Sequence, residues 1–154
     1  MPPPALGPGA LTLGSVMADG MTFRPISDGE DVTLVEGAQG GFHVWMKFRA
    51  KDVPAGPTTM FRTARRMTDD KLVLRSQTDT MVGAAGPDGT WEVPTPLPMF
   101  MCPSPVGLSV IDQPIVFRIE LQDSSGQTMA AQHIALVTHC PDSSLAFCMR
   151  ICTG

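Results

Sequence analysis

The sequence predicts an all-β protein, namely an antiparallel β-sandwich of immunoglobulin or fibronectin type with about eight or nine short strands. Two observations lead to this fold class. The chain holds 15 Gly and 15 Pro among 154 residues, and both types interrupt helices but are common in the turns between strands. Two segments also alternate between apolar and polar residues with a period of two, which is typical of half-buried strands.

The clearest strand covers residues 42–51, where successive side chains point to opposite faces. The apolar face predicted to lie in the core contains Phe42, Val44, Met46, Phe48 and Ala50. The opposite face carries His43, Trp45, Lys47, Arg49 and Lys51. A helix is disfavoured here because the segment is rich in aromatic and β-branched residues.

Residues 115–122 alternate in the same way, and residues 127–138 return as the partner strand after a turn at residues 123–126. Six residues of this hairpin are predicted to face the core: Ile115, Phe117, Ile119, Leu121, Ile134 and Leu136. If the turn is centred on residues 123–126, Ile115 lies opposite Ile134, and Cys140 lies opposite Ser109.

The remaining strands are predicted at residues 21–26, 31–36, 58–67, 72–77, 80–82 and 90–93. Arg62, Arg65 and Arg66 are expected on a solvated strand face. Residues 94–105 are expected to be irregular, because proline cannot donate to a sheet ladder. The tail after residue 140 is expected to contain at most one helical turn.

The domain organisation follows from the distribution of Pro and Gly. Residues 1–20 are predicted to be a Pro/Gly-rich flexible leader that folding does not require. Residues 21–154 are predicted to form a single β-sandwich domain with a Cys-rich C-terminal tail. Residues 1–10 have neither the positive charge nor the apolar core of a signal peptide. A Pro/Gly-rich tether of this kind suits a lipid-anchored protein.

Four cysteines lie in the C-terminal third of the chain: Cys102, Cys140, Cys148 and Cys152. An even number in a small chain predicts two disulfides and an oxidising compartment. The expected location is therefore extracytoplasmic, either periplasmic, outer-membrane-anchored or secreted. Four cysteines allow three pairings, and we expect at least one bridge between the tail and the Cys102 loop.

Composition and motifs argue against several classes of function. A net charge of −4 disfavours nucleic-acid binding, and no apolar run approaches the ~20 residues of a membrane helix. The sequence contains no Gly-x-Ser-x-Gly nucleophile motif, phosphate loop or dinucleotide fingerprint. We therefore expect no catalytic residues and no cofactor.

Two sets of residues suggest a metal site instead. His43, Trp45 and Met46 suggest copper, which accepts soft ligands, but His43 and Met46 point to opposite faces of a strand. His139, Cys140, Cys148 and Cys152 form a set that suggests zinc. Disulfides account for the same cysteines, so no metal ligand is assigned.

Recognition is the remaining possibility, and His43, Trp45 and Arg49 are the candidate binding residues. An exposed aromatic side chain flanked by cations can contact a protein or a glycan at the cell envelope. For Trp45 itself the favoured alternative is burial under a loop or in a second layer, because large apolar side chains are usually mostly buried.

The segment Gly37-Ala-Gln-Gly-Gly-Phe-His-Val-Trp45 resembles one found in uncharacterised secreted or lipid-anchored bacterial β-sandwich proteins. In these proteins a Gln-Gly-Gly-x-His-x-Trp element enters a strand. The resemblance extends over residues 21–53, residues 115–138 and the cysteines that follow. It implies an exported sandwich without a catalytic role, and it assigns no site residues.

The sequence thus predicts a non-enzymatic extracytoplasmic binding or structural module. The alternative is a periplasmic protein that binds a soft metal, either copper or zinc.

Overall fold

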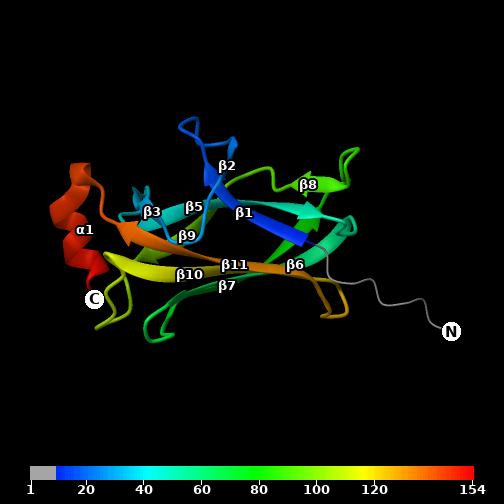
Figure 1. The fold of residues 1–154 in the computed structure, drawn as a ribbon. Helices are drawn as coiled ribbons and strands as arrows, with labels where there is room; N and C mark the ends of the chain where they lie inside the picture. The colour runs from blue at the N-terminus through cyan, green and yellow to red at the C-terminus, as the bar shows by residue number, and fades with distance from the viewer. Residues whose placement is uncertain (1–9) are drawn as a thin grey trace.

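A computed structural model describes residues 10–154, which form two packed β-sheets and a short helical segment at one end (Figure 1). The first sheet contains β1 (Ala10–Val16), β2 (Phe23–Pro25), β4 (Val35–Glu36), β5 (Phe42–Lys51), β8 (Thr90–Glu92) and β9 (Leu97–Cys102). The second contains β3 (Glu30–Thr33), β6 (Gly56–Arg66), β7 (Leu72–Val82), β10 (Gln113–Gln122) and β11 (Thr128–His139). A 3-10 turn, η1 (Asp142–Ser144), and α1 (Leu145–Cys152) follow β11.

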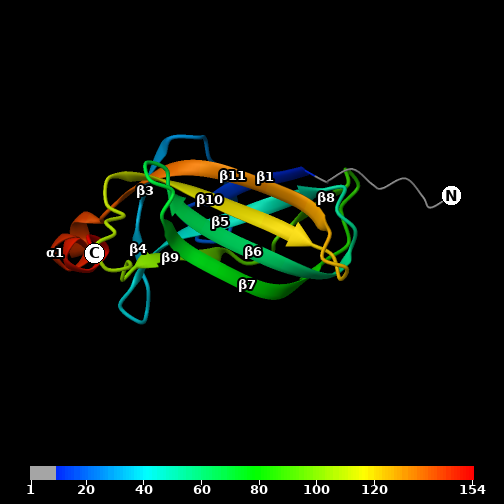
Figure 2. The same cartoon turned by 90° about the horizontal axis from the view of Figure 1, so that it is seen from below.

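This architecture confirms the predicted all-β sandwich, whereas the immunoglobulin or fibronectin type stays a prediction. The second sheet has the order β3-β11-β10-β6-β7 (Figure 2). Its only parallel pair is β3 with β11, and all other pairs within the described residues are antiparallel.

β5 is the central strand of the first sheet. It pairs with β1 and β4 along one side and with β8 and β9 along the other. The predicted core face of β5 is confirmed, since Phe42, Met46 and Phe48 are fully buried. The position of β5 explains why residues 42–51 give the clearest strand pattern in the sequence.

The β10–β11 hairpin confirms the predicted inward face but not the predicted register. Ile115, Phe117, Ile119 and Leu121 are fully buried. Ile115 lies opposite Leu136 rather than Ile134. The turn is longer than expected, since the Asp123 amide donates to the carbonyl of Gln127 over 2.9 Å. The hairpin also has a bulge at Leu121/Gln122, next to the turn. Each irregularity adds one residue to the β11 side.

The predicted flexible leader is wrong from Ala10 onward. β1 lies inside residues 1–20 and pairs with β5, and its Leu11 and Leu13 side chains are 5% and 4% exposed. The sandwich therefore includes residues 10–16 and does not start at residue 21. Residues 1–9 of the predicted leader lie outside the described residues. Leu11 and Leu13 alternate with Thr12 and Gly14 as in a half-buried strand, although the residues before them are rich in Pro and Gly.

The predicted irregular segment at residues 94–105 is also wrong, because it contains β9. Within residues 10–154 this strand pairs with β5 alone, so it lies at the edge of the described sheet, where proline is tolerated. Met99 and Met101 face the core at 0% and 1% exposure, whereas Phe100 is 53% exposed on the outer face.

Arg62 is a further exception, since it is buried rather than on a solvated face. Its guanidinium donates to the carbonyl of Pro98 and the hydroxyl of Ser76, each over 3.1 Å. Arg62 therefore connects β6 to the edges of β9 and β7, and its burial lowers its pKa.

All four cysteines are oxidised, as predicted. Cys102 bonds to Cys152, and Cys140 bonds to Cys148. The first bridge ties the tail to the end of β9, which confirms the expected link to the Cys102 segment. The tail is more helical than predicted, because α1 has eight residues.

Candidate functional site

The outer face of β5 carries all three predicted binding residues, but the structure separates them. Trp45 lies next to His43, where β5 pairs with β4 and β9. Arg49 lies where β5 pairs with β1 and β8. Trp45 and Arg49 are four positions apart along the strand, or about 13 Å at the usual rise. The face therefore holds two distinct groups of side chains.

The first group is an aromatic patch formed by Val35, His43, Trp45 and Phe100. The register places both Val35 and Phe100 opposite His43, one on each neighbouring strand. The His43 ring contacts the Trp45 ring edge-on, with centroids 4.2 Å apart, and the Phe100 ring with centroids 5.8 Å apart. Val35 and Phe100 are 40% and 53% exposed, so the patch presents apolar surface to solvent.

His43 is the unusual member of the aromatic patch. It is only 4% exposed, and neither ring nitrogen has a hydrogen-bond partner among the described residues. A Cβ on Gly37 would lie 3.5 Å from Nδ1 of His43, so the turn after β4 packs against the imidazole. Burial lowers the pKa of His43, and the ring is therefore neutral at pH 7. An unpaired polar group in such a position is costly to folding.

The second group comprises Lys47, Arg49, Glu92, Phe23 and Met21. The Lys47 ammonium is buried and donates to the Glu92 carboxylate over 2.9 Å and to the Met21 carbonyl over 2.8 Å. Arg49 donates to the same carboxylate over 3.0 Å and lies 4.2 Å above the Phe23 ring centroid. These bonds, led by that from Lys47, lower the pKa of Glu92. The cations predicted to flank Trp45 are thus engaged with Glu92.

Val35 and Phe100 are the members of the aromatic patch that were not predicted as site residues. Phe100 lies in residues 94–105, which were expected to be irregular. The alternation of Leu97, Met99 and Met101 with Pro98 and Phe100 was the available signal. Its position beside His43 depends on strand pairing, which the alternation by itself does not specify.

His139 belongs to a separate cluster with two aspartates. Its Nδ1 lies 2.6 Å from Asp112 and its Nε2 lies 2.7 Å from Asp31. Hydrogen bonds from the His139 ring to Asp31 and then to Asp112 raise the pKa of His139, since only the imidazolium can donate to both carboxylates. The cluster joins β3, the end of β11 and the loop before β10.

The residues of the two metal alternatives do not form a set of ligands. His139 contacts aspartates, and Cys140, Cys148 and Cys152 are in disulfides. Met46 is fully buried on the core face of β5, opposite to His43. Within residues 10–154, no group of three or more His, Cys, Asp or Glu side chains is arranged to hold a metal ion.

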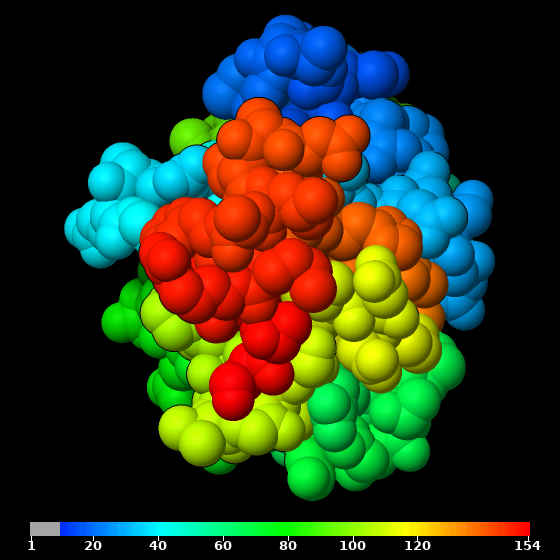
Figure 3. Space-filling view, turned by 90° about the vertical axis from the view of Figure 1, so that its left-hand side faces the viewer, coloured from blue at the N-terminus to red at the C-terminus, as the bar shows by residue number. Residues whose placement is uncertain are grey.

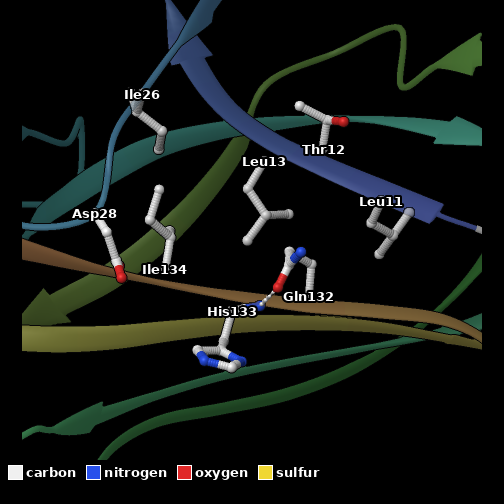
Figure 4. Close-up of a pocket in the computed structure, with 8 residues that line it drawn as sticks. All are labelled: Leu11, Thr12, Leu13, Ile26, Asp28, Gln132, His133 and Ile134. Carbon is white, nitrogen blue, oxygen red and sulfur yellow. Dashed lines mark hydrogen bonds between the residues drawn. The ribbon is translucent and has the colours of Figure 1, made fainter.

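A groove of about 290 Å³ lies between β1 and β11 at the opposite edge of the sandwich (Figure 4). Leu13, Ile26 and Ile134 point toward one another across it. Two of its polar groups are paired: the Asp28 carboxylate accepts from the Ala135 amide, and the Gln132 side chain accepts from the His133 amide. The Thr12 and His133 side chains also line the groove, so its lining is both apolar and polar.

Comparisons with known proteins do not extend this description. No protein-family model matches the chain, and no similar curated protein is found. The resemblance to exported bacterial sandwich proteins stays a prediction. Among the described residues, no helix has the length and apolar composition needed to cross a membrane.

Proposed function

We propose that this protein is a non-enzymatic, extracytoplasmic binding module and that the aromatic patch contacts its ligand. The observation that carries the proposal is His43, a buried neutral imidazole with two unpaired nitrogens, next to the partly exposed rings of Trp45 and Phe100. A buried polar group without a partner within the fold is a reasonable candidate to be satisfied by a ligand.

The chemistry of the patch favours a neutral glycan of the cell envelope. A neutral imidazole has one donor and one acceptor, and the hydroxyl groups of a sugar can pair with either. Both nitrogens are buried in this structure, so a sugar reaches them only when the turn after β4 moves aside. Aromatic rings provide flat apolar surface for the sugar ring at little cost in conformational entropy. Lys47 and Arg49 are paired with Glu92, so the nearby cations are not free to select an anionic ligand.

Two features support an extracytoplasmic location. Both disulfides join residues of the sandwich and its tail, and such bridges are typical of oxidising compartments. Many cell-surface domains share the sandwich architecture, and on this basis we also propose an immunoglobulin- or fibronectin-like type.

The test is binding of the purified protein to neutral and charged envelope polysaccharides, measured by calorimetry and by co-sedimentation. Phe100→Ala should weaken binding about tenfold or more, equivalent to about 1.4 kcal/mol. Because Phe100 is more than half exposed, its truncation should leave the fold intact.

Met81→Ala is the matched control, since Met81 is 62% exposed on β7 of the other sheet. Equal binding by wild type and Phe100→Ala would refute the proposed surface. Binding of charged glycans alone would refute the ligand class. Copper or zinc near one equivalent by elemental analysis would favour the metal-binding alternative instead.

A further inference from the structure

The two disulfides lie next to each other on α1. Cys148 and Cys152 are one helical turn apart, and their Sγ atoms are 3.7 Å from each other. Cys148 is bonded to Cys140 and Cys152 to Cys102. The four sulfurs therefore form a continuous series, in the order Cys140, Cys148, Cys152, Cys102.

Only one end of this series is accessible. Cys140 is half-buried, whereas Cys148 and Cys152 are fully buried and Cys102 is 4% exposed. Thiol–disulfide exchange requires access of a thiolate to a sulfur atom. An external thiol therefore reaches Cys140 before it reaches the other three.

We propose that Cys140 is a site of modification by low-molecular-weight thiols. Reaction at Cys140 then leads to cleavage of the second disulfide, Cys102–Cys152. The external thiolate bonds to Cys140 Sγ, the Cys140–Cys148 bond breaks, and Cys148 leaves as a thiolate. Cys148 then attacks the neighbouring Cys152 Sγ, the Cys102–Cys152 bond breaks, and Cys102 leaves as a thiolate that takes a proton from solvent.

A second external thiol completes the reaction. Its thiolate attacks the mixed disulfide at Cys140, which releases Cys140 as a thiolate that is protonated in turn. The two external thiols are oxidised to one disulfide, and the protein is reduced by the same two electrons. It retains one disulfide, Cys148–Cys152, and gains thiols at Cys102 and Cys140.

The product disulfide changes the end of α1. Disulfides form between Cβ atoms about 3.5–4.5 Å apart, whereas Cβ atoms four residues apart on a helix are about 5–6 Å from each other. Cys152 is the last residue of α1, so only the last turn of the helix has to open for Cys148 to bond to Cys152.

The consequence is the loss of both disulfide links between α1 and the sandwich in one two-electron reduction. Figure 3 shows α1 lying across this end of the molecule, over the segment that contains Cys102. After exchange, α1 is held by non-covalent contacts, including the Phe42–Phe147 ring pair at 5.7 Å and the hydrogen bond from the Val110 amide to the Cys152 carbonyl.

The test is partial reduction of the folded protein by reduced glutathione, followed by alkylation at acidic pH and peptide mapping. The expected two-electron intermediate carries thiols on Cys102 and Cys140, or glutathione on Cys140, together with a Cys148–Cys152 bridge. Thiols on Cys140 and Cys148 with an intact Cys102–Cys152 bridge would overturn the exchange step. Initial reduction of Cys102–Cys152, four thiols appearing together, or no reaction with glutathione would overturn Cys140 as the point of entry.

Two double variants serve as controls, with folding checked by circular dichroism. In Cys102→Ser/Cys152→Ser, the Cys140–Cys148 bridge should be reduced at the wild-type initial rate, and a Cys148 thiol should accumulate. In Cys140→Ser/Cys148→Ser, the remaining bridge should be reduced more slowly by a factor on the order of ten or more, since attack there requires local opening. Equal reduction rates in the two variants would refute Cys140 as the first sulfur attacked. If either variant does not fold, the peptide map of the partly reduced wild-type protein still decides between the outcomes.

Discussion

The docking of β1 leads to a quantitative prediction for Leu13→Ala. Leu13 is 4% exposed and lies opposite Phe48 in the β1–β5 pair. Truncation of a buried leucine to alanine costs about 2–5 kcal/mol, and the cost increases with the volume of the cavity that remains. Leu13 also lines the groove between β1 and β11, where neighbouring side chains can relax into the space. We therefore expect a loss of about 2–3 kcal/mol in the free energy of unfolding, in the lower part of that range.

The assay is urea denaturation under non-reducing conditions, followed by tryptophan fluorescence and circular dichroism. Thr12→Ala is the matched control, because Thr12 is exposed on the same strand and such substitutions usually change stability by less than about 0.5 kcal/mol. In thermal unfolding, the Leu13→Ala loss corresponds to roughly 4–12 °C for a domain of this size.

A Leu13→Ala variant as stable as Thr12→Ala would refute the reasoning. Such a result would mean that β1 is not part of the cooperative unit, and it would restore the flexible leader expected from the Pro/Gly content. Deletion of residues 1–18 tests the same point, since it removes β1 and should destabilise the protein at least as much as Leu13→Ala.

Three further predictions concern the core and the histidines. Phe117→Ala should cost about 3–5 kcal/mol in urea denaturation, because Phe117 is fully buried; a loss below about 1 kcal/mol would contradict this packing. Asp31 and Asp112 raise the pKa of His139, so its stabilising effect is complete below pH 6.5 and is lost as the pH rises through the folded-state pKa. His139→Asn should reduce this alkaline decline in melting temperature, and an unchanged decline would refute the role of the cluster. Burial lowers the pKa of His43, so the free energy of unfolding should fall as the pH drops below 6.5. His43→Phe should remove this decline, and a decline that persists in the variant would assign it to another group.

The fold class and the core faces could be predicted from the sequence because they depend on local geometry. Side chains alternate across a strand, so the pattern in residues 42–51 and 115–122 specifies which side chains face inward, whatever the neighbouring strands are. The even number of clustered cysteines similarly predicted oxidation without knowledge of the pairing. These properties follow from short segments or simple counts.

Neighbour relations depended on the tertiary structure. Phe100 meets His43 only because β9 pairs with β5, and no local pattern specifies which two strands pair. The hairpin register changed with a longer turn and one bulge, and the order of the four sulfurs depended on where α1 packs.

Arg62 shows most clearly what the sequence does not predict about a buried polar side chain. Its place in the alternation puts it on the inward face of β6 with Met60 and Ala64, but its charge predicted exposure. A guanidinium becomes tolerable in the interior only when partners compensate for its desolvation, and these are the Pro98 carbonyl and the Ser76 hydroxyl. The sequence by itself determined which residues alternate and which are apolar. Only the tertiary structure decided which polar groups find partners, as for the two terminal nitrogens of Arg62, and which do not, as for His43. Hydrogen bonds between distant segments exist only after the sheets have packed.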